Sequence, residues 1–264
     1  RFSTLGTEET VLKLTRPELR AFYQKYFAAE NAVLAVFGDI TVEDILPVIE
    51  TAFGPMRKGE IFLPPSAKGP RPEGIREETV TKEGIKQTVV MKGFSGTTVF
   101  DPDRYSLEML QSIFSGLSSP LFTRVRIEGG LAYYVGATQI LGLEPGAFIF
   151  YAGTVPGASG TVLEAYDAEV ARVARGEIPA EEMERNRNRL LGDFQFSLQS
   201  NRELAFRSGL DELYGLGYNA YRDYEERIRE VTVEDLARAA RKYLTRDNCA
   251  IAIVEPKGEI TKSE

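Results

Sequence analysis

The stretch from Leu14 to Phe37, LTRPELRAFYQKYFAAENAVLAVF, recurs near the other end of the chain. Its counterpart is Val231 to Val254, VTVEDLARAARKYLTRDNCAIAIV. The two stretches align without a gap, 217 positions apart. The identical residues are Thr15, Leu19, Lys25, Tyr26, Asn31 and Ala35, matched by Thr232, Leu236, Lys242, Tyr243, Asn248 and Ala252. Unrelated helix–turn–strand units could share part of this pattern. Because the register is held through the turn and strand, we interpret it as an internal repeat.

Each copy predicts a helix, a turn and a strand. Thr15 and Thr232 are expected N-caps, and an acidic residue stands three positions after each, as in a capping box. An apolar stripe at helical spacing follows in the first copy: Leu19, Phe22, Tyr23, Tyr26 and Phe27. Asn31 and Asn248 mark the turns before the strands.

The repeat also predicts the domain organisation. The second copy would close a module that begins near residue 61, and the first copy would close a preceding module. We therefore expect residues 1–60 to be the C-terminal remnant of a homologous domain, 61–74 a proline-rich linker, and 75–264 a second domain. The apolar helix faces of such a remnant would lie uncovered in this chain by itself, which predicts a partner or a homodimer.

The second module favours an α+β fold. Its first part predicts strands at 75–81 and 87–94, helices at 103–114 and 120–128, and a hairpin of strands at 131–139 and 147–153. Helices are then predicted at 161–175, 179–198, 201–214 and 219–229, before the second repeat copy. Grouped strands and grouped helices predict an antiparallel or mixed sheet with helices packed on one face.

Composition excludes several classes of function. The 264 residues contain no histidine and one cysteine, Cys249, which stands in an apolar run and is expected in the core. Sites that use histidine as catalyst or zinc ligand are therefore excluded in this chain. The formal charge is −7 without a basic block, and no apolar run approaches the ~20 residues of a membrane helix. We therefore expect neither nucleic acid nor a membrane as partner.

An ordered series of motifs runs along the chain. Leu5–Glu9 reads LGTEE, followed by the first repeat copy and Gly38-Asp39-Ile40. Later come GLSSPLF at 116–122, RIEGGLAY at 126–133, YAGT at 151–154 and NRLLG at 188–192. Taken in this order, and over nearly the whole chain, the sequence resembles the insulinase, pitrilysin and mitochondrial processing peptidase family of zinc peptidases.

The resemblance implies paired α+β domains of similar fold. The leading domain of an active pair carries an inverted zinc motif, H-x-x-E-H, and a distal glutamate, both upstream of the LGTEE stretch. It implies no cofactor in this chain, zinc in a catalytic domain or subunit, and a peptide as substrate. The expected function is the substrate-binding, non-catalytic portion of a zinc metalloendopeptidase with a closed two-half chamber. The alternatives are a catalytically dead structural or assembly subunit of the same family, and a stand-alone peptide-binding module.

The resemblance further implies that Arg126 and Tyr133 face the substrate backbone near the cleaved bond. An arginine at a helix end and a half-buried strand tyrosine are the plain structural alternative. Arg124 and Tyr134 are neighbouring rivals that match the family spacing less well. The loop 116–120 corresponds to one that admits substrate in some relatives, but with one glycine we favour a helix break. Asn186 and Asn188 are predicted to lie on a solvated helix face.

Overall fold

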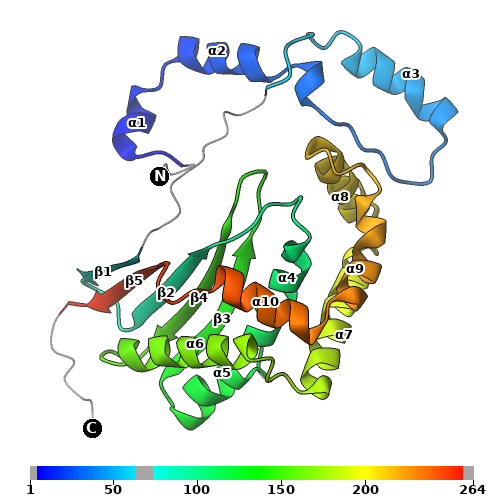
Figure 1. Ribbon diagram of the computed structural model, residues 1–264. Helices are drawn as coiled ribbons and strands as arrows, with labels where there is room; N and C mark the ends of the chain where they lie inside the picture. The colour runs from blue at the N-terminus through cyan, green and yellow to red at the C-terminus, as the bar shows by residue number, and fades with distance from the viewer. Residues whose placement is uncertain (1–4, 63–73, 258–264) are drawn as a thin grey trace. The chain divides into compact units, whose positions relative to one another are not determined.

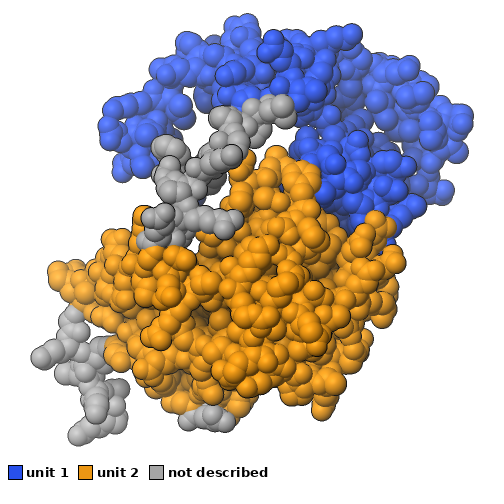
Figure 2. Space-filling model, viewed as in Figure 1, with its two compact units in different colours: residues 1–65, 197–222 blue, residues 66–196, 223–264 orange. Residues whose placement is uncertain are grey.

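The computed structural model describes residues 5–62 and 74–257 (Figure 1). The chain divides into two compact units (Figure 2). Unit 1 comprises residues 1–65 and 197–222, and unit 2 comprises residues 66–196 and 223–264. Among the described residues, no helix combines the length and the apolar character needed to cross a bilayer.

Unit 2 is built on a five-stranded mixed sheet. Its strands are β1 (Ile75–Lys82), β2 (Thr88–Ser95), β3 (Ala132–Ile140), β4 (Ala147–Thr154) and β5 (Cys249–Pro256), in the spatial order β1-β5-β2-β4-β3. β1 and β5 are parallel, and the other neighbours are antiparallel. The hairpin predicted from strands at 131–139 and 147–153 is β3–β4, and the predicted mixed sheet is confirmed.

Helices cover one face of this sheet. They are α4 (Asp103–Phe114), α5 (Pro120–Phe122), α6 (Ser159–Ala174) and α10 (Val233–Tyr243) (Figure 1). Phe148, Phe150 and Ala152 alternate along β4 and are fully buried in the core that these helices share. On the opposite face Met91 is 41% exposed, and none of the helices described in unit 2 packs there. The α+β class with helices on one face is therefore confirmed. Cys249 is buried in the core, as predicted.

The rest of unit 2 contains α7 (Ala180–Ser197), whose last residue belongs to unit 1, and α9 (Tyr224–Glu230). The 3₁₀ turn at Ala220–Asp223 precedes α9 and belongs to unit 1 except for Asp223. Residues 120–128 do not form the single α-helix predicted from the sequence. α5 passes into η2 (Thr123–Glu128), a π-helix in which Gly129 N donates to Arg124 O at 3.1 Å. The wider turn lets Leu131 N reach Val125 O at 3.0 Å, and the chain then enters β3.

Unit 1 contains α1 (Glu8–Lys13), α2 (Arg16–Tyr26), a 3₁₀ turn at Ala29–Asn31, α3 (Val42–Phe53) and α8 (Asn201–Leu213). A groove of about 480 Å³ lies between residues 31–35 and α8. The prediction of a strand after Asn31 is wrong. Residues 32–37 are extended, but they have no strand to pair with in the described part of the chain.

The two repeat copies fold alike over the helix and turn. Thr15 N donates to Glu18 Oε2 at 2.8 Å, and Thr232 N donates to Asp235 Oδ2 at 3.1 Å, so both predicted capping boxes are present. The turn asparagines also act alike. Asn31 Oδ1 accepts Phe62 N at 2.7 Å, and Asn248 Oδ1 accepts Gly74 N at 3.1 Å.

Candidate functional site

Arg126 projects from the π-helix η2. Ser119 caps the preceding helix by accepting the backbone N–H of Phe122 at 3.0 Å, which fixes where this segment starts. At its other end Gly130 adopts φ +60°, a conformation that favours glycine and that turns the chain into β3. π-helices are rare in proteins, and those that occur often lie at functional sites.

Tyr133 is the extra residue of a β-bulge. Ala132 pairs with Thr154 and Tyr134 pairs with Gly153, so Tyr133 has no partner on β4. A bulge redirects the side chain that it carries, and bulges are common beside active sites. The side chain of Tyr133 is 54% exposed.

The structure brings Arg126 and Tyr133 together. Arg126 Nη1 donates to the backbone carbonyl of Tyr133, and the guanidinium lies 5.3 Å from the centre of the Phe122 ring. The contact is therefore made through the tyrosine backbone, which leaves the phenol free to point elsewhere. Both residues are exposed, so both can reach a molecule outside the sheet.

The two rival residues have other surroundings. The ring of Tyr134 covers Gly153, where an added Cβ would lie 2.4 Å from Tyr134 Cε1. Arg124 lines a cavity of about 360 Å³ between η2 and α6, and neither Arg126 nor Tyr133 lines it.

The outer edge of β3 is occupied by side chains, which the sequence did not reveal. Ser115 Oγ accepts Ala137 N at 2.9 Å and donates to Ala137 O at 3.1 Å. Gln111 Oε1 accepts Gln139 N at 2.8 Å. Together with Arg126, these side chains satisfy backbone groups that an edge strand otherwise offers to an added strand. A peptide that paired with this edge would have to displace them.

The loop 116–120 is a helix break, as we favoured. Gly116 adopts φ +92°, Ser119 N donates to Gly116 O at 3.1 Å, and Arg189 of α7 donates to Ser115 O at 3.3 Å. The loop is thus held against α7.

The prediction that Asn186 lies on a solvated helix face is wrong. Its side chain is 7% exposed; Ser112 Oγ donates to its Oδ1 at 2.9 Å, and its Nδ2 donates to Glu182 O at 2.8 Å. The charged neighbours of Asn186 made the helix look solvated on this side, but α7 turns this position toward α4. Asn188 is exposed, as predicted.

The described residues contain no group of three or more histidine, cysteine, aspartate or glutamate side chains placed to hold a metal ion. Arg126 offers a cationic guanidinium and Tyr133 offers a phenol. Both groups can donate to carbonyl or carboxylate oxygens, and neither suits a metal ion.

Comparisons with known proteins agree with the sequence motifs. The family model described as the peptidase M16 inactive domain matches residues 13–190. Uncharacterized zinc proteases of Bacillus subtilis (YmxG) and Mycobacterium leprae are both 29% identical to this chain, over 98% and 92% of its length. The chain spans 62% and 55% of those two relatives. A crystal structure of a peptidase M16 inactive domain from Pseudomonas fluorescens superposes with a TM-score of 0.86 at 23% identity, covering 99% of this chain and 62% of that one. The resemblance inferred from the motifs is thereby confirmed, and the chain belongs to the family of the peptidase M16 inactive domain.

Proposed function

We propose that this chain forms the substrate-binding, non-catalytic wall of a zinc metalloendopeptidase, with Arg126 and Tyr133 facing the peptide. One observation carries the proposal: an exposed arginine and an exposed tyrosine meet where a π-turn enters a bulged strand. Membership in the inactive-domain family supports it, because the relatives are zinc proteases and this chain has no histidine.

The two side chains retain unused donors. A guanidinium has five N–H donors, of which one binds the Tyr133 carbonyl, and the phenol of Tyr133 can donate through its O–H. Both groups suit a polarised peptide carbonyl or the oxyanion that forms from it during hydrolysis. In this role they position the substrate and stabilise charge, whereas the metal and the general base belong to a catalytic domain or subunit.

Residues 1–60 belong, in this proposal, to a preceding homologous domain that carries the zinc. The exposed apolar faces of α2 and α3 support this assignment, since they have the pattern of buried helices without the cover. The proposed linker 61–74 falls almost entirely outside the described residues.

The test is made in the complete peptidase, with the variants Tyr133→Phe and Arg126→Lys. Tyr133→Phe removes only the hydroxyl, because the backbone carbonyl that binds Arg126 remains. Arg126→Lys keeps the charge but loses the planar fork of donors. Each is expected to lower kcat/KM for a peptide substrate by about 10² or more, the effect typical of losing one oxyanion donor.

Arg124→Lys is the matched control, since Arg124 lies on the same π-helix and lines a different cavity. It should leave kcat/KM unchanged. Wild-type turnover in both Tyr133→Phe and Arg126→Lys would refute the role of this pair. If the complete protein had no zinc-dependent activity at all, the assembly-subunit alternative would be favoured.

A further inference from the structure

The face of the unit 2 sheet that points away from the helices is uncharged across four strands. In its middle row Met91 of β2 stands between Tyr151 of β4 and Ala252 of β5, and Gly136 of β3 pairs with Tyr151. The two flanking rows are uncharged as well, and they comprise Tyr134, Gly153, Val89 and Val254 on one side and Thr138, Ile149, Gly93 and Ala250 on the other. We call these three rows the open face. Soluble domains rarely expose a contiguous apolar surface that has no partner.

Two tyrosine rings lie over glycines on the open face. A Cβ added at Gly153 would lie 2.4 Å from Tyr134 Cε1, and one added at Gly136 would lie 3.0 Å from Tyr151 Oη. The centres of the two rings are 6.2 Å apart. Tyr134 is 43% and Met91 is 41% exposed. The glycines therefore let two aromatic rings spread over the sheet next to an exposed, adaptable thioether.

The open face is continuous with the candidate site. Tyr134 directly follows Tyr133, whose backbone carbonyl accepts the hydrogen bond from Arg126. The outer edge of β3 is closed by Ser115 and Gln111, which occupy its backbone groups. A peptide held by Arg126 and Tyr133 thus cannot join β3 as a further strand without displacing these side chains. The open face is the apolar surface that adjoins the same two residues.

We infer that the open face receives a large uncharged side chain of the peptide, aromatic or branched aliphatic, which contacts Tyr134, Tyr151 and Met91. The inference rests on the proposed function, and it names the class of peptide that the wall selects. An aromatic side chain gains both apolar burial and ring–ring contact at this place. A lysine or glutamate side chain would lose water there without meeting an opposite charge, which is costly.

The binding test uses the full chain with carbon-13 label in its methionine methyl groups, read by NMR. Met91 is exposed, whereas Met109 and Met183 are buried and serve as internal references. The Met91→Leu variant assigns the Met91 signal. A short alanine–serine peptide with one central phenylalanine should shift this signal saturably and leave the two references in place. The same peptide with lysine at its centre should bind at least about tenfold more weakly.

Tyr134→Ala should weaken binding of the phenylalanine peptide. Tyr218→Ala is the matched control, because it removes an exposed tyrosine of unit 1 and should have no effect. A Met91 signal that does not move, or that moves equally with the phenylalanine and lysine peptides, would overturn the inference.

A change of charge tests selection in the complete peptidase. Met91→Glu should lower the ratio of kcat/KM for phenylalanine over lysine peptides by about tenfold or more, since the new carboxylate repels no lysine and pairs with it. Leu143→Glu is the matched control: Leu143 is also 41% exposed, but it lies in the loop between β3 and β4. The amount of folded enzyme cancels in this ratio, so lost stability cannot imitate the effect. An unchanged ratio in Met91→Glu would contradict the inference.

These outcomes can be told apart from those for Arg126 and Tyr133. Tyr133→Phe and Arg126→Lys should slow the turnover of all peptides alike, whereas Met91→Glu changes their order of preference. The NMR measurement requires no catalysis. A dimer of the chain that Met91→Glu dissociates in sedimentation, with no shift of Met91 by peptide in the wild type, would assign the open face to a second copy and overturn the inference.

Discussion

At the scale of single residues, burial separates two asparagines that the sequence treats alike. Asn186 and Asn188 lie on one helix among charged neighbours, yet only Asn186 points into the contact between α7 and α4. Its amide satisfies Ser112 and the backbone of Glu182, so its removal would leave polar groups unpaired in a buried place.

Asn186→Ala is therefore expected to lower the free energy of unfolding by about 1–3 kcal/mol, the cost of orphaned buried groups. Asn188→Ala, two positions away and exposed, should change it by less than about 0.5 kcal/mol. Urea denaturation of the full chain measures both values. Equal effects of the two substitutions would contradict the buried role of Asn186.

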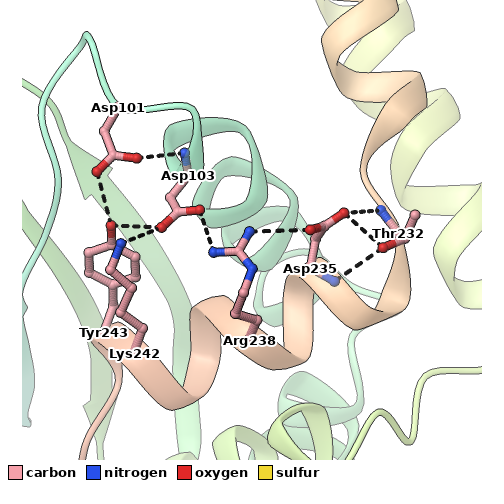
Figure 3. Close-up of polar contacts among 7 residues, drawn as sticks. All are labelled: Asp101, Asp103, Thr232, Asp235, Arg238, Lys242 and Tyr243. Carbon is pink, nitrogen blue, oxygen red and sulfur yellow. Dashed lines mark hydrogen bonds and ion pairs between the residues drawn. The ribbon is translucent and has the colours of Figure 1, made fainter.

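At the scale of elements, α4 and α10 are joined by a cluster of charges around Asp103 (Figure 3). Burial by itself raises the pKa of Asp103, but hydrogen bonds from Lys242, Arg238 and Tyr243 outweigh it and hold the pKa below its usual range. The native carboxylate therefore binds a proton more weakly than the unfolded one does. The stability that follows is fully present above the unfolded pKa of about 4 and is lost as the pH falls through the lower native pKa.

Asp103→Asn should destabilise the chain by about 1–3 kcal/mol at neutral pH, since two cations and a phenol lose a charged acceptor. It should also flatten the fall in stability below about pH 4 relative to the wild type. Chemical denaturation at several pH values gives both results. Glu177→Gln is the control, because the Glu177–Arg175 pair is exposed and contributes little. If the free energy of unfolding fell equally steeply at acid pH in Asp103→Asn, carboxylates other than Asp103 would be responsible for that fall.

At the scale of the whole molecule, the amino-acid composition predicts that this chain by itself binds no zinc. Tight zinc sites in proteins depend on histidine and cysteine, and the sequence has no histidine and one buried cysteine. The purified chain should therefore retain no stoichiometric zinc after dialysis and should hydrolyse no peptide. Metal analysis and a fluorogenic peptide assay check this. Proteolysis that a chelator abolishes, in this chain by itself, would contradict it.

Many helices of both units could be predicted from the sequence, because their signals are local. The capping boxes at Thr15 and Thr232, and the stripe that makes α10 a core helix, depend on residues a few positions apart. The π-helix was not predictable in this way. The sequence of η2 has ordinary helical spacing, and its wider turn is fixed by the closing bond from Gly129 to Arg124 and by the entry into β3. The family resemblance pointed to Arg126 and Tyr133, but it did not predict the bulge that carries the tyrosine.

By itself the sequence determined the fold class, the repeat, the family and the absence of zinc-binding histidine, since these follow from composition and from patterns along the chain. Only the tertiary structure decided that Asn186 is buried, that Ser115 and Gln111 close the edge of β3, and that α10 is covered while α2 is not. The physical reason is distance along the chain. A side chain's burial and hydrogen-bond partners depend on which remote segments meet it. The matched helices α2 and α10 therefore differ in exposure, although both begin at a capping box and share a leucine, a lysine and a tyrosine.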